Sequence, residues 1–136
     1  MIDFNYETDF VLHGAAEISR WIDGAIVEEG FKLGEINYVF CDDNYLYNLN
    51  QEFLKHDTLT DIISFDYTIG KIIQGDIFIS IERVKDNAID FNVPFDLELK
   101  RVMIHGVLHY CGYKDKTDVE SAIMRGKEDY YLERIN

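Results

Sequence analysis

Apolar residues recur along the chain in two patterns, one alternating and one with a helical period, and the two patterns predict strands and helices in turn. The alternating stretches predict strands at 2–7, 34–41, 62–67 and 75–81. The helical spacing predicts helices at 12–29, 42–53, 82–91, 94–111 and 117–132. This order predicts an α+β fold, with a mixed sheet of about four strands packed with about five helices.

Turn and cap residues set several of the expected boundaries. Pro94 suits the first turn of the helix that follows it, because its missing N–H has no partner there in any case. Thr117 or Asp118 can cap the last helix through a side-chain oxygen. Asp76, directly after Gly75, is expected to tighten a turn.

The composition is that of one domain spanning 1–136. Hydrophobic residues make up 47% of the chain and aromatic residues 14%, which is ample for a packed core. The chain shows no repeat, no low-complexity tract and no stretch near the roughly 20 apolar residues of a membrane span. The N-terminal residues lack the pattern of a secretion signal, and two cysteines are too few for a disulfide scaffold. We therefore expect a cytoplasmic protein.

The richest chemistry lies in the run from His105 to Asp115. His105 and His109 are four residues apart, so on a helix both imidazoles project from one face. Gly112 can end that helix in a left-handed turn and return Asp115 as a third ligand. Three protein ligands with open positions are typical of a catalytic metal site, most simply one zinc ion per chain. The carboxylate also makes manganese or magnesium possible. Without a metal, the two histidines would be core residues in an apolar helix and would need other polar partners.

The spacing matches the metal-binding half of the metzincin pattern, His-x-x-x-His-x-x-Gly-x-x-His. Many zinc peptidases place a glutamate after the first histidine as the general base. Gly106 stands at that position here. The pattern therefore favours a metal-dependent hydrolase whose substrate is not a peptide, and a metzincin-like peptidase stays an alternative.

The same run resembles the signature of the YbeY family of endoribonucleases, His-Gly-x-Leu-His-Leu-x-Gly-Tyr-Asp-His. Residues 60–66 resemble the family's Thr-Asp-Val-Leu-Ser-Phe segment, and residues 75–80 its Gly-Asp-Ile-x-Ile-Ser segment. Order and spacing agree from about residue 44 to the end of the chain. The resemblance implies a single-strand-specific, metal-dependent endoribonuclease with its metal in a cleft between the ligand helix and the sheet. It further implies a role in maturation of the 3′ end of small-subunit ribosomal RNA and in ribosome quality control.

Two positions depart from the family pattern. The third ligand is usually histidine, whereas Asp115 stands here. An arginine that usually precedes the Thr-Asp segment is replaced by Leu54. The neighbouring Lys55 is a candidate catalytic residue that would contact phosphate in its place, although a lysine offers a point charge rather than a bidentate fork.

Asp61 is the second candidate catalytic residue. Its carboxylate could orient the attacking water or a ligand histidine, which is a common arrangement around bound metals. Equally, Thr60 and Asp61 could only satisfy backbone groups of their loop. The residues do not identify the general base.

The net charge of −13 bears on the expected partners. Non-specific binding to nucleic acid depends on Lys and Arg, so a surface this acidic repels RNA in general. Lys114 and Lys116 flank Asp115 and could guide a phosphate locally, or could simply be solvated. The partners expected from the resemblance are ribosomal RNA and the small ribosomal subunit or its proteins, with no membrane and a monomeric chain. A further alternative is a ribosome-assembly factor with a structural metal, because an acidic surface suits basic ribosomal proteins.

Overall fold

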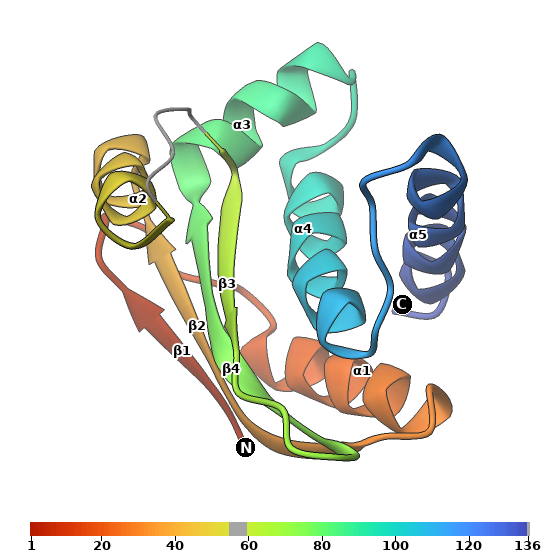
Figure 1. Ribbon diagram of the computed structural model, residues 1–136. Helices are drawn as coiled ribbons and strands as arrows, with labels where there is room; N and C mark the ends of the chain where they lie inside the picture. The colour runs from red at the N-terminus through yellow and green to blue at the C-terminus, as the bar shows by residue number, and fades with distance from the viewer. Residues whose placement is uncertain (55–59, 136) are drawn as a thin grey trace.

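The computed structural model describes residues 1–54 and 60–135, which form one four-stranded sheet with helices on both faces (Figure 1). In chain order the elements are β1 (Ile2–Tyr6), α1 (Ala15–Glu28), β2 (Lys32–Cys41), α2 (Asp43–Leu49), the π-helical turn η1 (Asn50–Leu54), β3 (Ile62–Asp66), β4 (Ile72–Ser80), α3 (Ile81–Asp90), α4 (Phe95–Tyr110) and α5 (Asp118–Leu132). The α+β fold that the sequence predicts is confirmed.

The sheet is mixed and has the strand order β1-β2-β4-β3. β1 and β4 each pair with β2 in parallel, whereas β3 pairs with β4 antiparallel. The parallel connection from β1 to β2 runs through α1, as parallel strands require a crossover. β4 therefore lies between β2 and β3, and the segment that carries Asp61 enters the sheet beside it.

Most of the core lies between one face of the sheet and helices α1, α4 and α5. Alternate residues of the strands point into it, as the two-residue period dictates, and Tyr38, Phe40, Ile77 and Ile79 have no exposed surface. The Tyr38 hydroxyl donates a hydrogen bond to the Met103 carbonyl at 2.9 Å, which ties β2 to α4. A smaller cluster around Cys41, Leu46 and Ile63 packs α2 against the opposite face.

Several boundaries differ from the sequence predictions. α1 begins at Ala15 rather than at residue 12, because Gly14 precedes it in a left-handed conformation; Leu12 is nevertheless buried in the core. The helix predicted over 42–53 is α-helical only to Leu49 and continues as a π-helical turn. β4 begins at Ile72, so Asp76 lies inside a strand and not in a turn.

Gly75 is needed within β4 for a close approach rather than for a turn. A Cβ atom there would lie 2.5 Å from the Phe65 carbonyl oxygen and 2.5 Å from the Tyr110 ring. The Tyr110 hydroxyl lies 3.0 Å from the Phe65 carbonyl and 2.9 Å from the Asp76 carbonyl. The glycine thus lets Tyr110, the neighbour of His109 in the last turn of α4, pack against β3 and β4.

Within residues 1–54 and 60–135, no helix is both long and apolar enough to cross a membrane.

Candidate metal centre

The last two turns of α4 carry the two histidines, and the reverse turn that follows the helix is built by local hydrogen bonds. The Tyr113 N–H donates to the Leu108 carbonyl at 3.1 Å, and the Gly112 N–H to the His109 carbonyl at 3.0 Å. These two bonds make a Schellman motif, which requires a left-handed residue, and Gly112 has φ 103°. The chain therefore reverses directly after the helix, as the sequence predicts.

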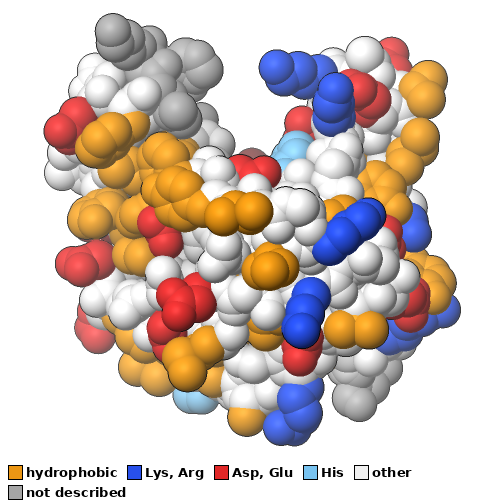
Figure 2. All heavy atoms as spheres, turned by 60° about the horizontal axis from the view of Figure 1, so that its bottom comes forward, with side chains coloured by type: hydrophobic (Ala, Val, Ile, Leu, Met, Phe, Trp, Pro, Cys, Tyr) orange, Lys and Arg blue, Asp and Glu red, His pale blue; other side chains and the backbone are white. Residues whose placement is uncertain are grey.

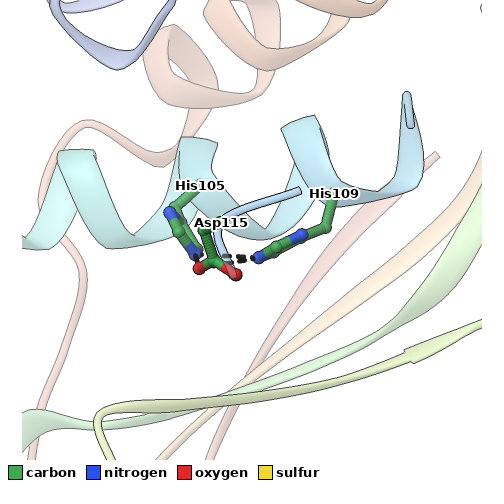
Figure 3. Close-up of side chains that lie close together, drawn as sticks. All are labelled: His105, His109 and Asp115. Atoms are coloured by element: carbon green, nitrogen blue, oxygen red, sulfur yellow. Dashed lines mark hydrogen bonds and ion pairs between the residues drawn. The ribbon is translucent and has the colours of Figure 1, made fainter. Parts of the chain in front are cut away.

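The reversal brings Asp115 back to the two histidines (Figure 3). The His105 and His109 Nε2 atoms are 3.0 Å apart. The Asp115 Oδ2 atom lies 3.2 Å from the first and 3.3 Å from the second. The Ser121 hydroxyl of α5 donates to the Asp115 carbonyl at 2.8 Å and holds this part of the loop. The structure thus brings together the three residues that the sequence singles out as metal ligands.

The second nitrogen of each histidine ring already has a partner. His105 Nδ1 donates to the Glu128 carboxylate at 2.6 Å, and His109 Nδ1 donates to the Tyr113 carbonyl at 2.9 Å. These bonds place the protons on Nδ1, so that both Nε2 atoms carry free lone pairs. Burial opposes protonation of His105, but the hydrogen bond and charge of Glu128 outweigh it and raise the pKa of the imidazole.

The arrangement fits a small divalent cation. Two ligand atoms about 2.0–2.1 Å from a tetrahedral zinc ion lie roughly 3.3 Å from each other. The separations of 3.0, 3.2 and 3.3 Å are close to that value. The side chains of His105 and His109 are 21% and 30% exposed, which leaves room for a substrate on the open side. The group could therefore hold a metal with positions left for chemistry.

Glu128 is the residue that sequence reasoning misses. It is 4% exposed and also accepts a hydrogen bond from Arg101 at 2.9 Å. The sequence carries a signal for it, because helical spacing places Glu128 on the same face as the apolar Met124 and Tyr131. An acid on an apolar helix face needs a polar partner.

A cavity of about 300 Å³ adjoins two of the three ligands, His105 and Asp115. It is lined mostly by polar residues, among them Asp61, Asn87, Glu98, Arg101, His105, Asp115, Arg125 and Glu128. Figure 2 shows a hollow in the surface with histidine and acidic side chains on its floor and basic side chains on one rim. The candidate ligands are therefore reachable from outside.

Asp61 lines this cavity but does not contact either histidine through a hydrogen bond. Its Oδ2 atom accepts from the Asn87 side chain at 3.4 Å, and its backbone carbonyl accepts from the Ser80 N–H at 3.0 Å. Burial raises the pKa of the Asp61 carboxyl above its ordinary value. The carboxylate that orients a histidine is therefore Glu128 and not Asp61. Lys55 lies outside the described residues.

Comparison with known proteins places these features in a family. The family described as "Endoribonuclease YbeY" matches residues 5–136. A protein of Flavobacterium johnsoniae named Endoribonuclease YbeY is 62% identical over 95% of this chain and 93% of its own length. Its namesake in Flavobacterium psychrophilum is 61% identical over 97% of this chain and 94% of its own length.

A solved structure agrees at the level of the fold. The solution structure of TM1509 from Thermotoga maritima superimposes with a TM-score of 0.71 at 27% sequence identity. The match covers 99% of this chain and 89% of that one.

Proposed function

This chain belongs to the YbeY family of endoribonucleases, and from that premise we propose that it is a metal-dependent endoribonuclease. The observation that carries the metal dependence is the convergence of the two Nε2 atoms and one Asp115 oxygen within 4.8 Å, with both Nδ1 atoms already engaged. The single active domain would be residues 1–136.

His105, His109 and Asp115 would hold the ion, and zinc is the metal that this set of two imidazoles and one carboxylate favours. The carboxylate oxygen of Asp115 is a harder Lewis base than an imidazole nitrogen. The site would therefore accept manganese or magnesium more readily than a site of three histidines would. A bound ion supplies Lewis acidity to the phosphodiester and lowers the pKa of a water ligand.

The chain's own residues would position this chemistry. Glu128 fixes the ring of His105, and the Tyr113 carbonyl fixes the ring of His109, so neither imidazole has to reorient when substrate arrives. We assign Asp61 to accept the proton of the nucleophile, because it lines the same cavity as His105 and Asp115. The raised pKa of the Asp61 carboxyl, caused by burial, suits a proton acceptor that works near neutrality. Lys55 stays the predicted phosphate contact.

The substrate we propose is single-stranded RNA within the maturing small ribosomal subunit, processed at the 3′ end of its RNA and during ribosome quality control. The protein would work in the cytoplasm as a monomer beside ribosomal RNA and small-subunit proteins. Its charge of −13 supports a partner that selects the substrate, since the chain has few cations for binding RNA indiscriminately.

The peptidase alternative loses support at Gly106. A Cβ atom at this position would lie 3.0 Å from Ile77 Cδ1 and 3.1 Å from Ile62 Cδ1, so this side of α4 faces the sheet. A glutamate there would crowd the side chains of Ile77 and Ile62. The site therefore lacks the place where a metzincin-type peptidase carries its base.

The test is metal content by elemental mass spectrometry and cleavage of single-stranded RNA, measured on the same samples of wild type and His109→Ala. We expect about one zinc per chain in the wild type, and loss of both metal and cleavage in the variant. His13→Ala removes an exposed histidine far along the chain from the ligands and should change neither. Cleavage that survives in metal-free His109→Ala would contradict the proposal. Metal bound without any cleavage would favour the assembly factor with a structural metal.

A further inference from the structure

Several residues that line the cavity beside the candidate metal centre have no part in the metal binding or proton transfer proposed above. Phe91 lines it and is 57% exposed, so part of its side chain is open to solvent beside the cavity. Ile62 and Val102 contribute apolar wall, and the Asn87 side chain contributes an amide. A flat aromatic face, apolar walls and an amide are the groups that proteins use to bind an unpaired base.

The position of Phe91 is set by the backbone around it. Its N–H donates to the Asn87 carbonyl at 2.9 Å, so it caps α3. Asn92 follows with φ 56°, and the Val93 N–H donates to the Ala88 carbonyl at 3.0 Å. Asparagine tolerates this left-handed conformation better than most residues do. The aromatic ring is thus attached to a rigid corner rather than to a free loop.

Two arginines, Arg101 and Arg125, also line the cavity, and they differ in whether an acidic side chain pairs with them. Arg101 is engaged by Glu128 at 2.9 Å and by Asp129 at 2.7 Å. Within the part of the chain that the structure describes, no hydrogen bond or ion pair engages the Arg125 guanidinium. The same wall carries the carboxyl groups of Glu98 and Glu128. Glu98 and Glu128 would repel a phosphate that enters the cavity. The Arg125 guanidinium, which has no such partner among the described residues, is therefore the group suited to bind it.

We propose that this cavity is a nucleoside subsite, in which one unpaired RNA base stacks on Phe91 and its phosphate is bound by Arg125. The inference rests on the proposed endoribonuclease function and adds the residues that recognise the substrate. At about 300 Å³ the cavity is at the small end of ligand pockets, roughly 300–1,000 Å³, and has room for one nucleotide. A base held in a duplex cannot enter, so the subsite supplies a physical reason for single-strand specificity.

The test is binding of a short fluorescein-labelled RNA with phosphorothioate linkages to the full, metal-loaded chain, followed by anisotropy. A gel after each titration checks that the RNA is intact. Phe91→Ala should weaken binding to single-stranded RNA about five- to tenfold, and Phe91→Tyr should retain it. Ile89→Ala, which removes a 76% exposed apolar side chain from the same helix, is the matched control and should bind as wild type. A fully paired, blunt-ended RNA duplex should not distinguish Phe91→Ala from wild type.

Salt dependence tests the second residue. Loss of one phosphate contact should lower the slope of log affinity against log salt concentration by about 0.7 for a single strand, so Arg125→Gln should lower it by that amount. Phe91→Ala should leave this slope unchanged. Arg20→Gln removes the same charge from an exposed position on α1 and should not alter the slope.

Two results would overturn the subsite: Phe91→Ala binding as tightly as Ile89→Ala, or Arg125→Gln keeping the wild-type salt slope. Failure of the wild type to bind the RNA would overturn it as well. Cleavage of unmodified RNA by the wild type is measured in a separate assay, which tests the proposed function itself. If the wild type cleaves RNA while the variants bind normally, only the subsite is wrong; if it cleaves no RNA, the proposed function is wrong.

Discussion

At the scale of single residues, the candidate metal centre depends on carboxylates with different tasks. Asp115 shares its oxygen between two imidazoles, whereas Glu128 accepts the Nδ1 proton of one of them. Glu128 is buried and also paired with Arg101, so its orientation is held from two sides. Such a partner keeps the ligand ring in the geometry that the metal needs.

We expect Glu128→Gln to lower zinc affinity about 10- to 100-fold, because the charge that holds the His105 ring is lost. Competition with a fluorescent zinc chelator measures the affinity. Glu133→Gln, at a 78% exposed side chain shortly after α5, is the control and should leave the affinity unchanged. A folded Glu128→Gln protein with wild-type zinc affinity would show that the carboxylate does not support the metal.

At the scale of secondary-structure elements, two features align α4 and α5 around the centre. Tyr110 locks the end of α4 onto β3 and β4 at Gly75. A capping box starts α5, in which the Thr117 hydroxyl accepts from the Glu120 N–H at 3.1 Å and the Glu120 carboxylate accepts from the Thr117 N–H at 3.0 Å. Because α5 carries Glu128, its start helps to set the position of the ligand partner.

Gly75→Ala should destabilise the protein by about 1–3 kcal/mol, because the added methyl collides with a carbonyl oxygen and the Tyr110 ring. Gly24→Ala is the same change on α1, where a Cβ atom meets nothing within 4 Å. That variant should instead be more stable by about 0.5–1 kcal/mol, as an alanine suits a helix interior. Urea unfolding measures both. Equal effects at the two positions would mean that the close approach at Gly75 is unimportant.

Thr117→Ala should lower the free energy of unfolding by about 1 kcal/mol, since the first turn of α5 loses its hydroxyl acceptor. Thr117→Ser retains the hydroxyl and should stay near wild type. The comparison is made by thermal unfolding of the three proteins. No difference between the alanine and serine variants would rule out a stabilising role for the cap.

At the scale of the whole molecule, Glu29 joins segments that are far apart in the sequence. It follows α1 and accepts hydrogen bonds from Tyr113 at 2.7 Å, from Lys127 at 3.0 Å and from the Tyr131 hydroxyl. The carboxylate therefore connects the end of α1 to the ligand-bearing loop and to α5. Burial would raise the pKa of Glu29, but these three hydrogen bonds outweigh it and lower the pKa below 4.5.

This lowered pKa predicts a pH dependence of stability. The folded state favours the ionised carboxylate, so its stabilisation is present above the pKa of the unfolded chain and is lost as the pH falls through the folded value. Glu29→Gln should therefore be less stable than wild type at pH 7, and the difference should shrink as the pH falls below 4.5. Thermal unfolding from neutral to acidic pH measures it, with the exposed Glu35→Gln as control. A difference that stays constant with pH would contradict this assignment.

The sequence by itself determined the features that depend on neighbours along the chain. Strand alternation and helical spacing predict the α+β fold, because burial on one face of an element imposes its own period. The spacing of His105, His109 and Gly112 predicts the ligand set, because the Schellman turn needs only hydrogen bonds within five residues.

Only the tertiary structure decided which distant groups complete the site. Glu128 meets His105 across 23 residues of sequence, and no local pattern states which acid will face which imidazole. Asp76 resembled a turn residue, yet Gly75 beside it serves a contact between β4 and the end of α4 that exists only once both have packed. Packing places such partners because a buried polar group must find its hydrogen bond within the folded chain, wherever along the sequence its partner lies.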